Sequence, residues 1–233
     1  KNKIEIMISS FESVSISRDK LNAFNFFNKY DFILKPYTVS LKFFSEQEFD
    51  SDFVILKQKN GSSGAGIYKV KKKHVLDFAK IMDLDNDQYI VQEYINFDYE
   101  TTTDVIMDSN NQMIELCQRK RLKIRGGEVE RAITTKDKDI TNLISNIIKK
   151  IPFFGVINIQ IMTKNNQHYF CEINPRFGGG FPLSYHAGAN MISHIQKLVK
   201  KTEIKPLGDT RYKNHYSMLR FDDAIYSDSL SDD

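Results

Sequence analysis

The clearest hydrophobic pattern in the chain is strict alternation over residues 156–162 and again over residues 169–174. The apolar positions of the first stretch are three isoleucines, Ile157, Ile159 and Ile161. Successive side chains of a strand point to opposite faces, so Asn158 and Gln160 share the other face. The polar segment 164–167 separates the two stretches and is typical of a turn. We therefore predict an antiparallel hairpin with one apolar and one polar face.

The second strand of this hairpin carries an acid and an amide, Glu172 and Asn174, with Arg176 two residues further on. Directly opposed residues of an antiparallel pair share a face, so the polar faces of both strands can line one site. We predict the register that places Gln160 opposite Glu172 and Asn158 opposite Asn174. By the same parity Cys171 faces the core. The alternative is a hairpin whose polar face is simply solvated.

A glycine-rich segment joins two shorter predicted strands, residues 53–57 and 67–70. Its residues are Gly61, Ser62, Ser63, Gly64, Ala65 and Gly66. A Walker loop or a Rossmann fingerprint needs a helix directly after the glycines, and a strand follows here. The backbone N–H groups of such a flap can close on phosphates, whereas the alternative is an ordinary hairpin turn. Lys57, just before the loop, suits a phosphate contact, although a strand lysine is usually just solvated.

A basic strand is predicted over residues 112–125. One face of this strand carries four cations, Arg119, Arg121, Lys123 and Arg125. Like charges along one strand face repel, so they must be exposed or face anions. We expect Glu128 to pair with one of the four. A nucleic-acid groove would also accept this row, but the surrounding aromatics and glycines form no known nucleic-acid motif.

The remaining chain alternates between short strands and amphipathic helices. Residues 17–19 provide an N-cap for a helix over residues 20–30. Further predicted strands cover residues 4–8, 89–95, 101–107 and 216–221, and further helices cover 74–82, 137–150 and part of 182–199.

The composition restricts the class of protein but does not indicate a particular reaction. The 233 residues are 41% hydrophobic, which suffices for one large domain or two small lobes. A net charge of +3 does not by itself indicate nucleic acid. The two cysteines, Cys117 and Cys171, form no disulfide framework, and a reducing cytoplasm fits them. No apolar run reaches membrane-spanning length, and no signal peptide is visible.

The segments N-I-Q at 158–160 and C-E-I-N-P-R-F-G-G-G at 171–180 resemble the metal-binding core of the ATP-grasp superfamily, most closely its carbamoyl-phosphate-synthase-like branch. Further pieces of the pattern recur in order between Ser17 and Lys200. The resemblance implies an α+β fold, in which two lobes with antiparallel sheets clamp a nucleotide. It also implies an ATP-dependent carboxylate-amine ligase, which activates a carboxylate as an acyl phosphate for attack by an amine or thiol.

The resemblance assigns roles to specific residues. The metal ligands would be Gln160, Glu172 and Asn174, and the catalytic cations Arg176, Arg119 and Arg121. ATP would contact Lys57, the loop residues Gly61, Ser62, Ser63, Gly64 and Gly66, the adenine-reading segment Gln92, Glu93, Tyr94 and Ile95, and Glu100 near the ribose or the metal. The cofactors would be ATP and Mg²⁺, with Mn²⁺ as an alternative. Glu100 could otherwise be a surface acid.

We expect four segments. Residues 1–18 would be the remnant of a preceding α/β domain that is mostly absent, 19–92 the small lobe with its leading helix, 93–205 the large lobe, and 206–233 a C-terminal extension. The partners would be small carboxylates and amines, not nucleic acid or membrane, and an oligomer stays open. Two other classes remain: a nucleotide-binding module without ligase activity, and a polyanion binder that uses the basic strand.

Overall fold

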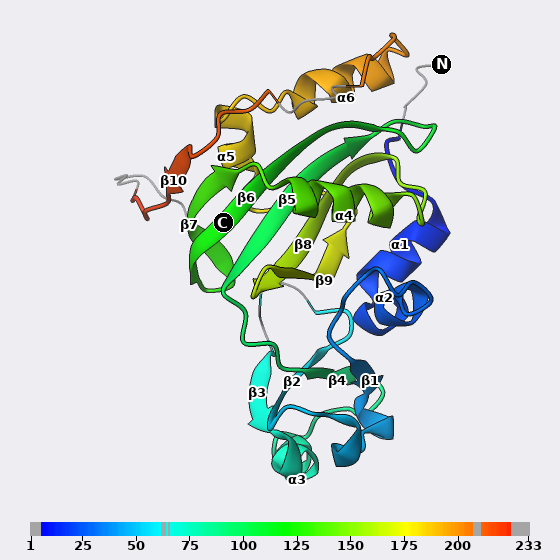
Figure 1. The fold of residues 1–233 in the computed structure, drawn as a ribbon, viewed down its shortest axis with the longest axis vertical. Helices are drawn as coiled ribbons and strands as arrows, with labels where there is room; N and C mark the ends of the chain where they lie inside the picture. The colour runs from blue at the N-terminus through cyan, green and yellow to red at the C-terminus, as the bar shows by residue number, and fades with distance from the viewer. Residues whose placement is uncertain (1–5, 62–63, 65, 207–210, 225–233) are drawn as a thin grey trace, which may run out of the picture.

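Two antiparallel sheets occupy opposite ends of the molecule in the computed structural model, which describes residues 6–61, 64, 66–206 and 211–224 (Figure 1). The smaller sheet has the strand order β1-β4-β2-β3, and the larger has the order β10-β7-β6-β5-β8-β9. This arrangement agrees with the predicted pair of lobes with antiparallel sheets.

The small sheet is built from residues 38–93. Its strands are β1 (Thr38–Ser40), β2 (Phe53–Gln58), β3 (Tyr68–Lys71) and β4 (Tyr89–Glu93). Three 3-10 turns and one helix complete it: η1 (Leu41–Phe43), η2 (Glu46–Glu48), η3 (Lys72–His74) and α3 (Val75–Ile81). Val54, Leu56 and Val91 lie in the core of this sheet together with Val75 of α3.

The large sheet presents one face to helix α4 (Lys138–Ile148) and the other to α5 (Phe181–His186) and α6 (Met191–Val199) (Figure 1). Its strands are β5 (Tyr99–Met107), β6 (Met113–Arg125), β7 (Glu128–Thr135), β8 (Gly155–Lys164), β9 (Gln167–Asn174) and β10 (Ser217–Leu219). Isoleucines recur on α4 at helical spacing and pack against the apolar face of β8.

The N-terminal helices α1 (Phe11–Arg18) and α2 (Lys20–Phe27) lie beside β9 of the large sheet (Figure 1). Asp19 caps α2 as predicted, because its side chain accepts the N–H groups of Leu21 and Asn22. Ala23 and Phe27 of α2 are buried in the core of the large sheet, where the Phe27 ring centroid lies 4.7 Å from that of Phe170. The leading helix, which we had grouped with the small lobe, thus packs its buried face on the large one.

The predicted register of the β8–β9 hairpin is confirmed, with Gln160 opposite Glu172 and Asn158 opposite Asn174. The register then shifts after Gln160, so that the next paired residue of β9 is Phe170 and Cys171 is left as an extra residue. Such a bulge inverts the alternation of side chains.

The bulge corrects one prediction. Phe170 before it and Ile173 after it both reach the core, although one has an even and the other an odd number. Strand parity predicts that Cys171 faces the core. In the structure Cys171 is half-buried and lines a cavity instead.

Most other predicted elements are present within a few residues of their expected ends. The described part of the predicted 4–8 strand, residues 6–8, is not a strand, and residues 4 and 5 lie outside the described residues. Helix α1, strands β1 and β7 and the turns η1 and η2 were not predicted, and the region from residue 181 to 199 holds two helices, α5 and α6, where one was predicted. Strand β10 pairs with β7, so the C-terminal segment adds an edge to the large sheet.

Candidate functional site

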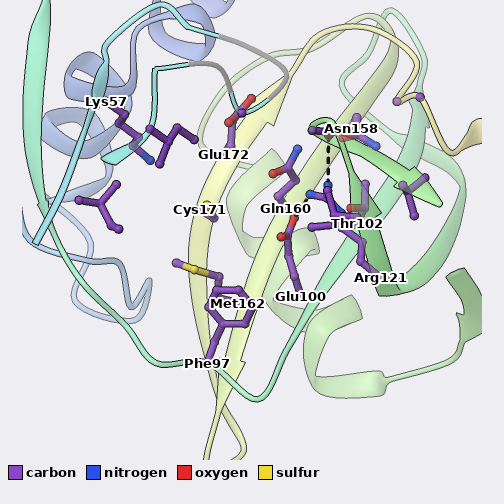
Figure 2. Close-up of a pocket in the computed structure, with 18 of the residues that line it drawn as sticks. Lys57, Phe97, Glu100, Thr102, Arg121, Asn158, Gln160, Met162, Cys171 and Glu172 are labelled. Atoms are coloured by element: carbon purple, nitrogen blue, oxygen red, sulfur yellow. Dashed lines mark hydrogen bonds and ion pairs between the residues drawn. The ribbon is translucent and has the colours of Figure 1, made fainter. Parts of the chain in front are cut away.

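A cavity of about 360 Å³ lies between the two sheets and is lined by side chains from both (Figure 2). Strands β2 and β4 supply one wall, and β5, β6, β8 and β9 supply the other, together with the turn of residues 176–180. A volume of this size is typical of a small-molecule site. The fold therefore brings together stretches that are far apart in the sequence.

The polar face of the hairpin forms the floor of the cavity. Gln160 and Glu172 both line it, in the positions that the register predicts (Figure 2). Asn174 is not part of the lining, and its Nδ2 donates to Glu172 Oε1 at 2.7 Å. Asn158 lines the cavity in its place, and Asn158 Nδ2 donates to Asp104 Oδ1 at 2.7 Å. The oxygen-rich set facing the cavity is thus Glu172, Gln160 and Asn158, with Asn174 supporting Glu172.

Lys57 enters the cavity from the small sheet (Figure 2). The residue is only 7% exposed, and Lys57 Nζ donates to Gln92 Oε1 at 2.8 Å. Gln92 Nε2 in turn donates to Thr38 Oγ1 at 2.8 Å. The Gln92 side chain therefore orients Lys57, in addition to any role of the backbone around it.

Two glycines of the glycine-rich loop lie at or near the cavity. Gly64 lines the cavity, and the Gly61 carbonyl accepts a hydrogen bond from Lys20 Nζ at 2.6 Å. Gly66 is described but does not line the cavity, and Ser62, Ser63 and Ala65 lie outside the described residues. Lys20 also lines the cavity, and burial lowers its pKa while the nearby Glu172 carboxylate opposes this shift.

The segment after β4 forms an apolar end of the cavity. Tyr94 and Ile95 follow β4 and belong to the lining together with Gln92 and Glu93 at the end of that strand, so all four residues of the predicted adenine-reading segment line the cavity. Phe97 and Met162 lie close together at this end (Figure 2). Apolar side chains at one end of a cavity are suited to a heteroaromatic ring.

The four cations predicted on one face of the basic strand each contact a carboxylate of this chain. Arg119 pairs with Asp104 at 2.8 Å and Arg121 with Glu100 at 2.7 Å. Outside the cavity, Lys123 contacts Glu130 and Arg125 contacts Asp222. The predicted pairing of Glu128 was wrong, because Glu128 contacts Arg220 at 3.4 Å, and Glu130 contacts Lys123 and Arg125 instead.

Only the first two of these cations, Arg119 and Arg121, line the cavity. The register between β6 and β7 shifts on both sides of Lys123, which interrupts the continuous basic face that alternation alone had predicted. Glu100 is half-buried beside Arg121, and its partial removal from water raises its pKa against the opposing effect of that guanidinium. Glu100 is therefore a lining acid with an ionic partner rather than a surface acid.

The triple glycine closes the large-sheet wall. A Cβ built on Gly178 would lie 2.6 Å from Asn158 Nδ2, and one on Gly180 would overlap Arg119 Nη1. The backbone of this turn therefore packs directly on the two side chains. Arg176, just before it, lines the cavity and donates from Nη1 to the Phe177 carbonyl at 2.9 Å.

Some lining residues were absent from the sequence-based list. Thr102 is one of them, and it alternates with Glu100 along β5, so the face that they share could have been inferred from parity. Thr102 lines the cavity opposite Gln160. Asn158 lay on the polar face of the hairpin but was not assigned a role. Lys20 stood at the predicted start of a helix, and nothing in the pattern placed it at the loop.

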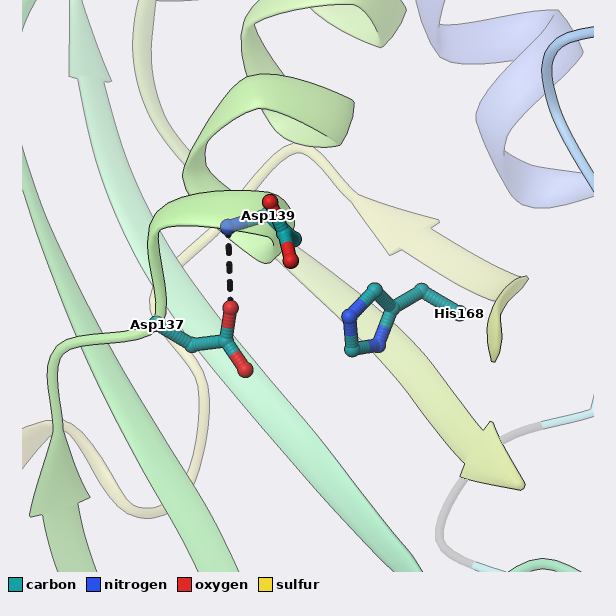
Figure 3. Close-up of side chains that lie close together, drawn as sticks. All are labelled: Asp137, Asp139 and His168. Carbon is teal, nitrogen blue, oxygen red and sulfur yellow. Dashed lines mark hydrogen bonds between the residues drawn. The ribbon is translucent and has the colours of Figure 1, made fainter. Parts of the chain in front are cut away.

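A second group of metal-type ligands, Asp137, Asp139 and His168, has ligand atoms within 4.8 Å of one another (Figure 3). Asp137 Oδ1 accepts the N–H groups of Asp139 and Ile140 and so caps α4. His168 Nδ1 shares a hydrogen bond with Thr163 Oγ1 at 3.0 Å. These contacts explain the cluster as a helix cap beside a hairpin, so we assign it no ion.

Comparison with known proteins gives concordant results. A family described as "ATPgrasp_Ter: ATP-grasp in the biosynthetic pathway with Ter operon" matches residues 85–219, more than half of the chain. A curated relative, the formate-dependent phosphoribosylglycinamide formyltransferase of Prochlorococcus marinus, is 26% identical over 136 residues, which cover 53% of this chain and 34% of that protein. The chain thus spans about a third of the length of this relative.

Two solved structures share the fold at low identity. The biotin carboxylase domain of 2-oxoglutarate carboxylase from Hydrogenobacter thermophilus, in complex with MgADP and bicarbonate, matches with a TM-score of 0.69 and 14% identity over 89% of this chain and 49% of that one. The N5-carboxyaminoimidazole ribonucleotide synthetase of Thermus thermophilus matches with a TM-score of 0.68 and 13% identity over 89% and 58%. Among the described residues, no helix is both long and apolar enough to span a membrane.

Proposed function

The chain belongs to the ATP-grasp family, and from that premise we propose that it carries the ATP-binding part of a ligase that activates a carboxylate for attack by an amine or thiol. The observation that carries the proposal is the arrangement of the cavity. Oxygen ligands on the large sheet, Gln160 and Glu172, line the same space as Lys57 of the small sheet. This arrangement suits a nucleotide triphosphate held between a metal ion and a cation.

In this proposal adenine lies against Gln92, Glu93, Tyr94 and Ile95, with Phe97 and Met162 at the apolar end. The phosphates lie under the glycine-rich loop, near Lys57 and Lys20. Glu100 lies further along the cavity, where it would meet the ribose or the metal-site groups. The relatives support nucleotide use, because solved neighbours are described as complexes with ADP or ATP.

The donor set fits magnesium, with manganese as an alternative. Magnesium prefers oxygen ligands and keeps several waters or phosphate oxygens in its shell, so few protein ligands are needed. Glu172 would supply the carboxylate and Gln160 a carbonyl oxygen. Asn174 was expected as the third ligand, yet it does not line the cavity whereas Asn158 does, so we propose the Asn158 carbonyl as an additional candidate. The ion would neutralise charge on the phosphates.

The reaction would begin when a carboxylate oxygen of the substrate attacks the γ-phosphorus. The bond from that phosphorus to the bridging oxygen breaks, and ADP leaves with the electron pair. The amine nitrogen then attacks the carbonyl carbon of the acyl phosphate, the C–O bond to phosphate breaks, and the nitrogen loses a proton. Phosphoryl transfer depends on positioning and charge neutralisation, which Lys57, Arg119, Arg121 and Arg176 would provide.

The test is ADP release by the full-length protein with magnesium and ATP, measured against a panel of amino acids and small carboxylates. We expect release to depend on both magnesium and one carboxylate–amine combination. Binding of MgADP without release under any combination would favour the alternative of a non-catalytic nucleotide-binding module. Binding of polyanions with a steep salt dependence would favour the other alternative, although four of the cations of β6, namely Arg119, Arg121, Lys123 and Arg125, are already paired with carboxylates.

A further inference from the structure

Asp104 lies in the middle of β5 and is fully buried. Its carboxylate accepts hydrogen bonds from three side chains on three other elements. Arg119 of β6 donates from Nε at 3.1 Å and from Nη2 at 2.8 Å, Asn158 of β8 donates from Nδ2 at 2.7 Å, and Ser184 of α5 donates from Oγ at 2.7 Å. The carboxylate does not itself line the cavity between the sheets.

Two of these three donors do line the cavity, Arg119 and Asn158. Arg119 uses Nε and Nη2 on Asp104, and its remaining nitrogen, Nη1, has no hydrogen bond with the described residues. Nη1 lies beside the glycine turn, since a Cβ on Gly180 would overlap it. Asn158 likewise donates from Nδ2 to Asp104, so its carbonyl oxygen is still available as an acceptor for a ligand. One buried carboxylate therefore fixes both a donor and an acceptor of the cavity wall.

The arrangement leaves the Arg119 guanidinium little freedom. Two parallel hydrogen bonds to one carboxylate fix the plane of the planar guanidinium group. The glycine turn packs against its edge, and the residue is 2% exposed. A group that is ordered during folding needs no ordering when a ligand binds, which is the advantage of preorganised electrostatic sites.

We propose that Asp104 is a positioning residue, which acts through Arg119 by aiming Nη1 at a phosphate or carboxylate oxygen in the cavity. The anion could be a phosphoryl group or a substrate carboxylate, and both would present an oxygen to Nη1. This inference rests on the proposed function in so far as the anion belongs to ATP or to the activated substrate.

The first test compares the binding of inorganic phosphate and of acetate to the parent protein and to Asp104→Asn, Arg119→Ala and the double variant, by calorimetry. Loss of a charge-assisted hydrogen bond predicts at least about tenfold weaker binding of the preferred anion in each single variant. Because Asp104 acts through Arg119, the double variant should bind no more weakly than Arg119→Ala. Additive losses, or phosphate and acetate binding that neither variant changes, would overturn the proposal.

A matched control is Glu115→Gln, which removes another buried carboxylate from the same sheet. Glu115 lies on β6, is 2% exposed and does not line the cavity between the sheets. This variant should lose stability without losing anion binding. If it weakens anion binding as much as Asp104→Asn does, the effect of Asp104 is general damage to the sheet and the proposal fails.

The second test does not depend on the folding of Asp104→Asn. In Arg119→Ala the Asp104 carboxylate loses its ionic partner, so guanidinium ion at millimolar concentration should occupy the vacated position, stabilise the variant and restore anion binding. Urea has a similar shape but no charge and should do neither. Equal effects of the two compounds on Arg119→Ala would contradict the assignment of Asp104 as an anchor.

Failure of the proposed function would be seen separately. Adenosine, which carries no phosphate and needs no metal ion, should bind with unchanged affinity to Asp104→Asn, since the adenine end lies on other elements. If the parent binds phosphate through Arg119 but never binds a magnesium nucleotide, the ligase proposal falls and the positioning role of Asp104 stands. If the parent binds MgADP but substitution of Asp104 or Arg119 leaves its anion affinity unchanged, the positioning role of Asp104 falls and the ligase proposal stands.

Discussion

Gln160 and Glu172 lie directly opposite each other on β8 and β9, at the last pair before the register of the hairpin shifts. The shift leaves Cys171 unpaired, so Glu172 stands next to a bulge. Bulges commonly redirect side chains beside active sites. Here the carboxylate of Glu172, the amide of the opposed Gln160 and the thiol of the neighbouring Cys171 all line one cavity.

The first prediction concerns the charge of Glu172. Glu172→Gln keeps the size of the side chain and removes the only carboxylate of the proposed metal ligands. We expect magnesium-dependent ADP release by the full-length protein to be abolished, whereas ADP binding at the adenine end persists. The control is Asp139→Asn, which removes an exposed carboxylate of the cluster at α4. Unchanged ADP release in Glu172→Gln would refute the metal site.

The second prediction concerns Lys57. A ligand present at ~100 times its dissociation constant stabilises a protein by ~2.7 kcal/mol, and Lys57→Ala should reduce the stabilisation by MgADP at the same concentration. The fold should survive, but the variant also leaves Gln92 Oε1 without its donor, which costs about 1–3 kcal/mol in a buried site. Urea unfolding with and without MgADP separates the two effects.

The matched control for Lys57 is Thr38→Val, which breaks the other end of the same chain of hydrogen bonds without touching the cavity lining. It should lower stability and leave MgADP binding intact. Should Lys57→Ala bind MgADP as tightly as the parent, Lys57 would have to be removed from the site.

The third prediction concerns Gly180. An alanine there would place its Cβ on Arg119 Nη1, and Arg119 is fixed by Asp104 and cannot easily move. We expect Gly180→Ala to destabilise the protein by about 1–3 kcal/mol, measured by urea unfolding. In an Arg119→Ala background the same substitution should cost much less, because the obstacle is gone. An equal cost in both backgrounds would mean that the strain arises elsewhere.

The fourth prediction concerns the reactivity of Cys171. Burial raises its pKa from 9.0 to about 11, so the thiol remains protonated at neutral pH and only the thiolate reacts with alkylating reagents. Alkylation should therefore be slow near neutrality and rise about tenfold per pH unit as the pH approaches the raised value. Bound MgADP should slow it further, as measured by mass spectrometry of the peptide that contains Cys171.

The buried Cys117 serves as the internal comparison, because burial raises its pKa to about 12 and it does not line the cavity. Both cysteines should react equally fast in denaturant. Rapid alkylation of Cys171 in the folded protein at neutral pH, or no protection by MgADP, would show that the thiol is not placed as described.

Local patterns predicted the hairpin that holds Gln160 and Glu172, because a period of two and a polar turn together allow few registers. Sequence could not predict the bulge at Cys171, since parity arguments assume an uninterrupted ladder. Helix α1 was missed because its sequence is rich in serine, and the Ser10 cap and the Ser13 hydroxyl on the Pro152 carbonyl appear only in three dimensions.

The acid partners of the basic strand show a second limit. Alternation identified four cations on one face, but the register between neighbouring strands decides which carboxylates they meet. Asp104 and Arg119 are fifteen positions apart and meet because β5 and β6 pair as they do. Glu130 and Glu128 differ by two positions, and the register shifts around Lys123 decide that Glu130 contacts the strand.

Helix α2 connects the two walls of the cavity between the sheets. Its residues Ala23 and Phe27 are buried in the core of the large sheet. At its first turn, Lys20 Nζ donates a hydrogen bond to the carbonyl of Gly61, at the start of the glycine-rich loop. Any rotation that separates the sheets must either break this bond or pull the helix out of its packing. The dwell time of a bound nucleotide would then depend on how firmly α2 is seated, at positions that never touch the nucleotide.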